Sequence, residues 1–257
     1  MQSSNPRISI AGSGKMASAM GLALKLSGAT IVEVASRNKL KLAELSSLLG
    51  AKEARDFSSM STDVDAIAVL VKDDAIKEVS SLLPANTSKF HASGVTSIDE
   101  LGGDVVGVVW PIKSINNKSV AEGFQGVPMG VEANTPEFST FLNKIATLMG
   151  GEAFEANSKT RSLVHLAAVF TDNFANHCLT LSQEILSNSE LDPKLMKSLA
   201  EGLTNGAFNG DSFSRQTGVA LRGDTMSQEK HLSILSEDRL KEFYKFLSNH
   251  IKNHHEL

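Results

Sequence analysis

The chain has 257 residues, with 25 lysines and arginines against 29 aspartates and glutamates, so its net charge is −4 and its pI is about 6.0. This charge argues against a general polyanion binder, which needs a basic surface. The single cysteine, Cys178, excludes an internal disulfide and a multi-cysteine zinc site, and it suits a reducing cytoplasm. No apolar run approaches the ~18 residues of a membrane span. We therefore expect a soluble cytoplasmic protein without a metal, a nucleic-acid partner or a membrane partner.

The first half of the chain alternates between strand and helix patterns. Apolar or β-branched runs predict strands at 8–11, 30–36, 66–71, 88–91, 104–110, 127–131 and 151–154. Helical patterns lie at 15–27, 39–49 and 136–149, and Asp73 is expected to cap a further helix that runs to Leu83. The six consecutive apolar residues at 66–71 are typical of a central strand that is covered on both faces. The alternation predicts a Rossmann fold, in which a doubly wound, mostly parallel sheet has right-handed crossovers.

The pattern changes near Ala156. One helical pattern without glycine or proline runs from 158 to 187, a second helix is predicted at 193–208 and a third at 235–251, with a loop at 209–224. The sequence therefore predicts an α/β domain over 1–155 and an all-α domain over 156–257.

A glycine-rich loop joins the first predicted strand to the first predicted helix. Its residues, Gly12-Ser13-Gly14-Lys15-Met16-Ala17, have the spacing GxGxxA. In a nucleotide-binding unit the first glycine makes the tight turn and the second lets backbone N–H groups approach a pyrophosphate, while a small third residue lets helix and strand pack closely. The alternative is a tight turn without a ligand. The complete strand–loop–helix–strand context favours nucleotide binding.

The end of the second strand indicates which nucleotide. An NAD site usually carries an acid there to hold the ribose 2′-hydroxyl, whereas this chain has Ser36 followed by Arg37. A guanidinium matches a phosphate bidentately, so we predict NADP(H), with Ser36 and Arg37 at the 2′-phosphate. NAD(H) is the alternative, with Arg37 as a solvated helix-start residue; Glu33 is a weaker candidate acid because it lies inside the strand.

Residues that follow the later strands are further candidates, because ligands of open α/β sheets bind beyond the carboxyl ends of the strands. Val71 and Lys72 are expected near the nicotinamide ribose. Ser93 and Lys113 are candidates to bind the cofactor amide or a substrate, with ordinary loop polarity as the alternative. Trp110, beside a proline, is more typical of packing than of stacking on a ligand.

Polar residues on the long predicted helix form a stripe. His165, Asp172 and Asn176 fall within about 20° of one another at 100° per residue, and Asn173 flanks them. Such a stripe faces water, a cleft or a buried network. In the later Thr217–Asp224 loop, Arg222 is a candidate to bind an anionic group and Asp224 to fix Arg222, with a plain interhelical turn as the alternative.

Together these motifs resemble a known pairing. The glycine loop with Ser36-Arg37 is similar to the first half of pyrroline-5-carboxylate reductases and related short NADP oxidoreductases. The segment from His165 to Phe174, together with Thr217-Gly218, Arg222-Gly223-Asp224 and His231-Leu232, resembles the family that joins a Rossmann-like half to domain of unknown function 2520. The resemblance implies a helical second domain like that of 6-phosphogluconate dehydrogenase and a homodimer formed through it. Relatives tend to show His-Pro where this chain has Trp110-Pro111-Ile112-Lys113.

Two functions remain open from the sequence. The first is an NADP-dependent oxidoreductase that transfers a hydride between NADP(H) and a small, anionic imine or carbonyl/hydroxy compound. In it, His165 donates the proton, with Lys113 as the alternative acid, and Asn173 orients the substrate or the nicotinamide. Arg222, Asp224 and Thr217 hold the substrate. The second is a non-catalytic dinucleotide-binding sensor or assembly protein, which the Trp110 departure favours.

Overall fold

The computed structural model describes residues 5–116 and 119–255. The chain forms two compact units that divide between Asn176 and His177. The last strand ends at Glu155, and every described element after it is helical. The change from strands to helices thus falls where the sequence pattern changes, whereas the two units divide later, inside the long helix. The domain boundary at 155/156 stays a prediction.

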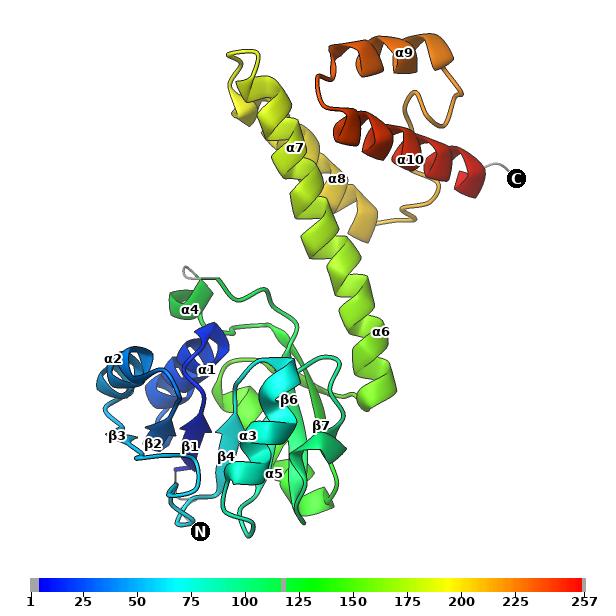
Figure 1. Cartoon of the computed structure of the whole chain (residues 1–257). Coiled ribbons are helices and arrows are strands. Elements are labelled where there is room, and N and C mark those ends of the chain that lie inside the picture. The colour runs from blue at the N-terminus through cyan, green and yellow to red at the C-terminus, as the bar shows by residue number, and fades with distance from the viewer. Residues whose placement is uncertain (1–4, 117–118, 256–257) are drawn as a thin grey trace. The chain divides into compact units, whose positions relative to one another are not determined.

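The first unit is built on one eight-stranded sheet with the order β3-β2-β1-β4-β5-β6-β7-β8 (Figure 1). The strands are β1 (Arg7–Ala11), β2 (Thr30–Ala35), β3 (Lys52–Glu53), β4 (Ala66–Val69), β5 (Lys89–His91), β6 (Val106–Pro111), β7 (Pro128–Ala133) and β8 (Glu152–Glu155). Among the described strands, β6 and β7 pair antiparallel and all other neighbours pair parallel. The predicted mostly parallel, doubly wound sheet is therefore confirmed. The strand order reverses between β1 and β4, which is where such sheets bind ligands.

Four helices follow the strands as the sequence predicts, with end points close to the expected ones: α1 (Lys15–Leu26), α2 (Lys39–Leu49), α3 (Ile76–Leu82) and α5 (Pro136–Leu148). A short helix that the sequence does not predict, α4 (Ser119–Glu122), lies between β6 and β7. The Asn38 side chain accepts from the Lys41 N–H at the start of α2, and Gly50 ends that helix in the left-handed region. The predicted cap at Asp73 is wrong. Asp73 begins a short 3₁₀ turn, Asp73–Ala75, and α3 starts only after it.

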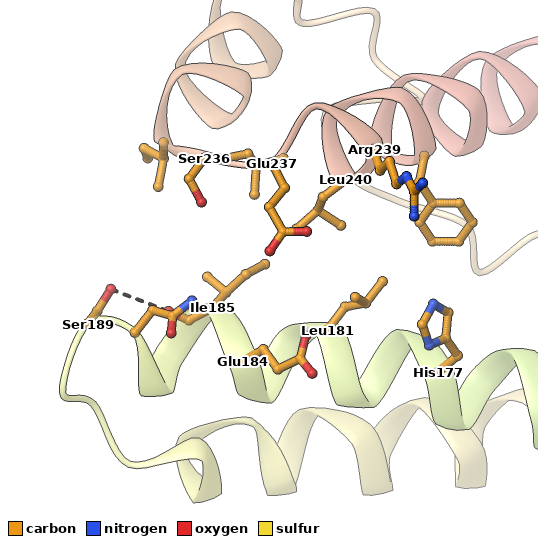
Figure 2. A pocket seen from close by; sticks show the side chains of 13 residues that line it. His177, Leu181, Glu184, Ile185, Ser189, Ser236, Glu237, Arg239 and Leu240 are labelled. Carbon is orange, nitrogen blue, oxygen red and sulfur yellow. Dashed lines mark hydrogen bonds between the residues drawn. The ribbon is translucent and has the colours of Figure 1, made fainter.

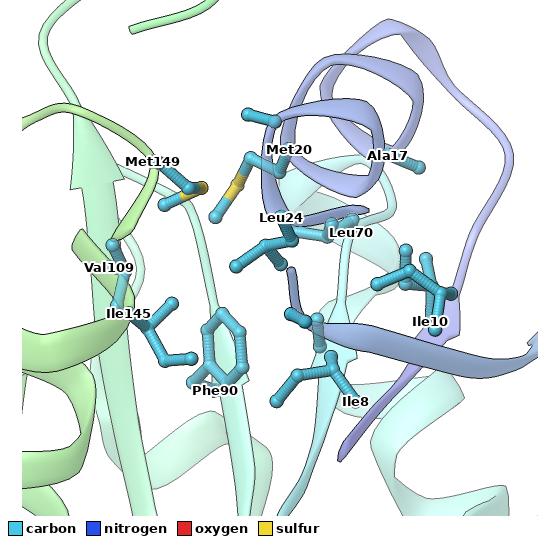
Figure 3. Close-up of a cluster of buried hydrophobic side chains, with 14 of the residues drawn as sticks. Ile8, Ile10, Ala17, Met20, Leu24, Leu70, Phe90, Val109, Ile145 and Met149 are labelled. Carbon is cyan, nitrogen blue, oxygen red and sulfur yellow. The ribbon is translucent and has the colours of Figure 1, made fainter. Parts of the chain in front are cut away.

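The sheet is covered on both faces, because side chains alternate along each strand. Ile8 and Ile10 of β1 belong to a core that α1, α2 and α5 cover, and Figure 3 shows Met20, Leu24 and Ile145 closing over them. Other residues belong to a second core beneath α3: Ala11, Ile67, Val69, Ile76, Val79 and Leu101. All of β4 is buried, as predicted for a central strand. This burial fixes the strand ends that carry the candidate site.

The long helix predicted at 158–187 is interrupted. An α-helix, α6 (Ser158–Ala168), is followed by a π-helical segment, Val169–Phe174, and then by α7 (Ala175–Ser187). A π-turn closes hydrogen bonds from i to i+5 and holds more residues than an α-turn. The rotation of 100° per residue assumed for the His165, Asp172 and Asn176 stripe therefore does not hold across this segment, and the predicted alignment is wrong.

Among its described residues, the second unit has helices joined by loops and turns, and no strand. It contains α7, a 3₁₀ turn at Pro193–Met196, α8 (Lys197–Phe208), α9 (Thr225–Ile234) and α10 (Asp238–His255). The sequence analysis missed α9, although its start is marked by Asp224, whose side chain accepts from the Ser227 N–H. None of the helices in the described part of the chain is long and apolar enough to cross a membrane.

Candidate functional site

The glycine loop depends on Gly12, the first residue after β1. The φ of Gly12 is +132°, and its N–H donates to the carbonyl of Ala35 at 2.8 Å. A Cβ atom placed on Gly12 would lie 2.2 Å from the Leu70 carbonyl oxygen, at the end of β4. Both the left-handed backbone and this close approach require glycine. The loop is thus held against the ends of both strands that flank β1.

The following residues leave the start of α1 open. Gly14 caps α1 without a side-chain hydrogen bond, and a Cβ atom placed on it would meet nothing within 4 Å. The first turn of α1 carries no acidic residue. The free N–H groups and the positive end of the helix dipole therefore face space that an anion can fill. Ala17 is fully buried, as expected for the small third residue of the motif.

A cavity of about 480 Å³ lies at the strand-order reversal and gathers most of the predicted cofactor residues. Among the residues lining it are Gly12, Ser13, Gly14, Lys15, Met16, Ser36, Arg37, Val71 and Lys72. The sequence analysis missed Asn38 and the apolar walls that Phe57, Leu70, Ala75 and Val79 supply. Ala75 and Val79 were recoverable, since they follow β4 in the predicted helix, whereas nothing in the sequence marks Phe57. The structure therefore brings three separate segments of the chain to one binding site.

The end of β2 shows how two of these residues are held. Ser36 shares a 2.6 Å hydrogen bond with Ser13 and accepts from the Asn38 N–H at 3.2 Å. Arg37 forms an ion pair with Glu78 of α3, at 2.5 Å between Nη2 and Oε1. Glu33, the alternative acid, accepts from the Ser61 N–H. Glu33 does not line the cavity, so it is not the acid that a ribose at this site would meet.

The hydroxyl of Ser93 is engaged within its own loop. The side chain is buried, its hydroxyl donates to Thr96 at 2.9 Å, and it accepts from the N–H groups of Val95 and Thr96. Ser93 does not line the nucleotide cavity. Its hydroxyl closes a turn after β5, and its donor and acceptor positions are already used by bonds within that turn. The cofactor role of Ser93 stays a prediction.

Arg161 of α6 is a buried residue that the sequence analysis missed. Its guanidinium pairs with Glu132 of β7 and donates to the carbonyls of Ala156, at 3.0 Å, and Thr96, at 2.7 Å. Arg161 is fully buried, whereas Glu132 keeps about a fifth of its side chain exposed. A charge buried to this degree is stable only with such partners. Arg161 thus fastens the start of α6 to the sheet.

His91, at the end of β5, lies in the same polar region. Its Nδ1 accepts from the Ser93 N–H at 3.0 Å. An accepting Nδ1 carries no proton, so this bond favours the neutral ring and also fixes its position. Burial, aided by the charge of Arg161, lowers the pKa of His91 to about 4. A histidine with this pKa does not donate protons near neutrality. His91 is therefore a structural residue of this unit.

His165, the predicted proton donor, lies one turn beyond Arg161 and is half-buried. Its ring centroid is 5.9 Å from that of Trp110, with a 57° angle between the ring planes. A Cβ atom placed on Gly94 would lie 2.7 Å from the indole and 3.1 Å from Nδ1 of His165. The small Gly94 thus makes room for both rings. Trp110 packs against the candidate acid, in agreement with the packing role predicted for it.

The other candidate catalytic residues are placed differently. Nζ of Lys113 donates to the Gly123 carbonyl at 2.9 Å and pairs with Glu122 at 3.2 Å, so Lys113 holds a loop. Ser114 donates to Asp172 of the π-helical segment. Asn173 is exposed on that segment. Of the two candidate acids, Lys113 is therefore bound to the Gly123 carbonyl and Glu122. No hydrogen bond described in the structure involves the ring of His165.

The Thr217–Asp224 loop belongs to the second unit. Both carboxylate oxygens of Asp224 bind Ser227, one its N–H at 3.0 Å and the other its hydroxyl at 2.7 Å, and these bonds hold the pKa of Asp224 below its ordinary value. Asp224 thus caps α9, and the nearby charge of Arg222 also lowers its pKa, so its predicted role of fixing Arg222 stays a prediction. Thr217 and Arg222 have exposed side chains. Only Arg222 offers a cation to an anionic ligand in this loop.

The second unit has a cavity of its own, of about 350 Å³, between α7 and the start of α10. Figure 2 shows Leu181 and Ile185 of α7 pointing toward Leu240, with Glu184 and Glu237 at the edges. None of the predicted site residues lines this cavity. Its lining carries Arg239 and His177 as well as the two carboxylates, so its charge does not favour an anionic ligand in particular. Within 5–116 and 119–255, no group of three or more histidine, cysteine, aspartate or glutamate residues is arranged to hold a metal ion.

Comparisons with known proteins agree with this architecture. Residues 7–97 match the family model "NADP oxidoreductase coenzyme F420-dependent", and residues 127–251 match that of domain of unknown function 2520. The resemblance predicted from the sequence motifs is therefore confirmed. No curated protein matches the chain significantly in sequence.

Solved structures extend the likeness to nearly the whole chain. A proposed NADP oxidoreductase from Bacteroides fragilis is 26% identical, with 97% of this chain and 98% of that chain covered and a TM-score of 0.86. An imine reductase from Myxococcus stipitatus in complex with NADP+ is 17% identical, with 96% and 92% covered and a TM-score of 0.65. A pyrroline-5-carboxylate reductase from Coxiella burnetii is 18% identical, with 98% and 97% covered and a TM-score of 0.57. The last two show that the fold is shared.

Proposed function

We propose that this protein is an NADP-dependent oxidoreductase that transfers a hydride between NADP(H) and a small, anionic imine or carbonyl/hydroxy compound. The observation that carries the proposal is the cavity that unites the glycine loop, Ser36-Arg37 and Val71-Lys72 at the strand-order reversal. The match of residues 7–97 to an NADP oxidoreductase model supports it. So does the likeness to an imine reductase solved with NADP+.

The residues present fit a dinucleotide. The open space beside Gly14 and the N–H groups at the start of α1 suit a pyrophosphate. Lys15 adds a positive charge at the same loop, and Arg37, which lines the cavity, is the proposed partner of the 2′-phosphate. Bound NADP(H) would supply or accept the hydride. The chain itself has to bind the cofactor, orient the substrate and provide a proton.

The proton role falls to His165. Imidazole is a common general acid in enzymes, and this one is half-buried against Trp110, with the small Gly94 making room for both rings. An imine or carbonyl carbon that accepts a hydride needs a proton on its nitrogen or oxygen, which the imidazole can give. Arg222 is the proposed partner of the substrate's negative group, and exposed Asn173 the proposed orienting amide.

The test is NADPH oxidation by the full-length chain against a panel of keto acids and cyclic imines. We expect turnover on at least one substrate, and a fall in kcat of about 100-fold in His165→Ala, in line with the loss of a general acid. His250→Ala, a change on exposed α10, is the matched control and should keep full activity. Unchanged turnover in His165→Ala would remove His165 from the mechanism. Tight NADPH binding without turnover on any substrate would instead support the non-catalytic binding protein.

A homodimer formed through the helical unit is part of the proposal. Leu195, Leu199 and Leu203 follow one another at intervals of four residues, which places them on one face of α8 and the turn before it. They are 60%, 71% and 72% exposed. A contiguous apolar stripe of this kind is typical of an interface. A second copy of the chain is the occupant that the family resemblance implies.

A further inference from the structure

Arg37, the residue proposed to bind the 2′-phosphate, already forms an ion pair with Glu78. Arg37 lines the nucleotide cavity from the end of β2, and its guanidinium reaches Glu78 on α3. Ala75 and Val79, on either side of Glu78 in the sequence, line the same cavity, whereas Glu78 does not. The ion pair therefore joins a residue of the cavity lining to a carboxylate outside it, at Arg37, where we propose that the 2′-phosphate binds. Both side chains remain more than half exposed, so the pair can open.

NADP and NAD would interact differently with the Arg37–Glu78 ion pair. A phosphate monoester carries about −1.5 to −2 charges at pH 7, so a 2′-phosphate on Arg37 has to displace the Glu78 carboxylate or bind beside it. Like charges a few ångströms apart repel even near a protein surface. The uncharged 2′-hydroxyl of NAD brings no such repulsion, and a carboxylate can accept its hydrogen bond. The same glutamate thus acts against one nucleotide and not against the other.

We propose that Glu78 is a specificity-determining residue whose carboxylate competes with the 2′-phosphate for Arg37 and narrows the preference for NADP(H) over NAD(H). The inference rests on the proposed function, because it needs a dinucleotide in this cavity. Ser36 can add one hydrogen bond to the phosphate when Ser13 is the donor of their shared bond, but it brings no positive charge. Glu33 is engaged by Ser61 and does not act at this end. The balance between the nucleotides therefore lies with Arg37 and Glu78.

The test is the dissociation constants of NADP+ and NAD+, measured by calorimetry on the full-length chain. In Glu78→Gln we expect NADP+ to bind about three- to tenfold more tightly and NAD+ to change less than about twofold. The matched control is Glu100→Gln, which breaks another ion pair of α3, with Lys77 at 3.1 Å, and should change neither constant. Thermal melting of each variant checks the fold.

Two further outcomes are decisive. In an Arg37→Ala background the gain from Glu78→Gln should shrink, because the carboxylate no longer has a guanidinium to compete for; an equal gain in both backgrounds overturns the inference. A parallel change for both nucleotides in Glu78→Gln, or no change for either, also overturns it and leaves the proposed function standing. If the unmodified chain binds neither nucleotide, the proposed function fails, and the inference fails with it.

Discussion

The two units of this chain treat their apolar side chains in opposite ways. In the first unit, leucine, isoleucine and valine side chains form two cores that enclose the sheet. In the second unit, Ala220 and Ser248 are the only buried residues among those described, while Leu199, Leu203 and Phe208 are 71%, 72% and 75% exposed. A sheet between two helical layers completes its own core, whereas an amphipathic helix needs a further surface to bury its stripe. Three predictions test this difference between the units, and they are given in order of their expected effect on the free energy of unfolding.

The largest effect is expected from the buried guanidinium of the first unit. Arg161→Met removes the partner of Glu132 and leaves the carbonyls of Thr96 and Ala156 without a donor. We expect the free energy of unfolding, measured in urea, to fall by about 3–5 kcal/mol. Glu132→Leu added to Arg161→Met should recover part of this loss, because no uncompensated charge then remains.

The control for Arg161 is an exposed arginine of the same unit. Arg55 is 83% exposed and pairs with Asp56 at 3.0 Å, so Arg55→Met should change stability by less than about 0.5 kcal/mol. Equal losses for the two variants would show that Arg161 does not anchor the start of α6.

A smaller effect is expected from His91, and it depends on pH. The pKa of His91 is about 4 in the folded chain and about 6.5 in the unfolded chain. Between these values the unfolded chain binds a proton that the folded chain does not, so stability rises with pH. As the pH falls from 6.5 to 4, the free energy of unfolding should drop by up to about 3 kcal/mol from this group.

Removing the histidine should remove its share of that pH dependence. In His91→Gln the slope of unfolding free energy against pH should be shallower between pH 4 and 6.5. His250→Gln, on exposed α10, should keep the slope of the unmodified chain. An unchanged slope in His91→Gln would mean that the buried ring does not resist protonation.

The smallest effect on the stability of the first unit is expected from the exposed stripe of the second. Leu199→Glu together with Leu203→Glu removes apolar surface that the unit does not itself bury. Light scattering should show a dimer for the unmodified chain and a monomer for the double variant. The sheet should unfold at the same urea concentration, within error. Leu26→Glu, 78% exposed on α1, is the control and should remain dimeric. A monomer before any substitution would refute the proposed dimer.

The sequence predicts the first unit well because its signals are local. Local signals here are the glycines at 12 and 50, which specify the backbone, and the apolar run that begins at Ala66, which specifies burial. The end of β2 likewise places Arg37 at the cavity. The ion pair of Arg37 with Glu78, 41 positions apart, has no such signal, because it depends on how two crossovers meet. The burial of Arg161 also has no local signal, because a basic residue in a helical pattern is usually exposed.

In the second half of the chain, the prediction failed where backbone geometry departs from the regular form. The π-helical segment at Val169–Phe174 contains no glycine or proline that would mark it, so a stripe counted at 100° per residue could not be correct. The sequence pattern does not predict α9, so it gives no sign that Asp224 caps the start of that helix. In both cases a local hydrogen-bonding pattern, rather than hydrophobic periodicity, decides the structure.

Gly12 has one more consequence. Its N–H is bonded to the end of β2, and its Cα lies against the backbone after β4, so the loop takes its shape when the sheet forms. The conformational entropy of that loop is lost during folding and is not lost again when a ligand arrives. The pyrophosphate end of the site is therefore preorganised, whereas the adenosine end has to exchange Glu78 for the ligand. Affinity should thus come mainly from the rigid end, and discrimination from the adaptable one.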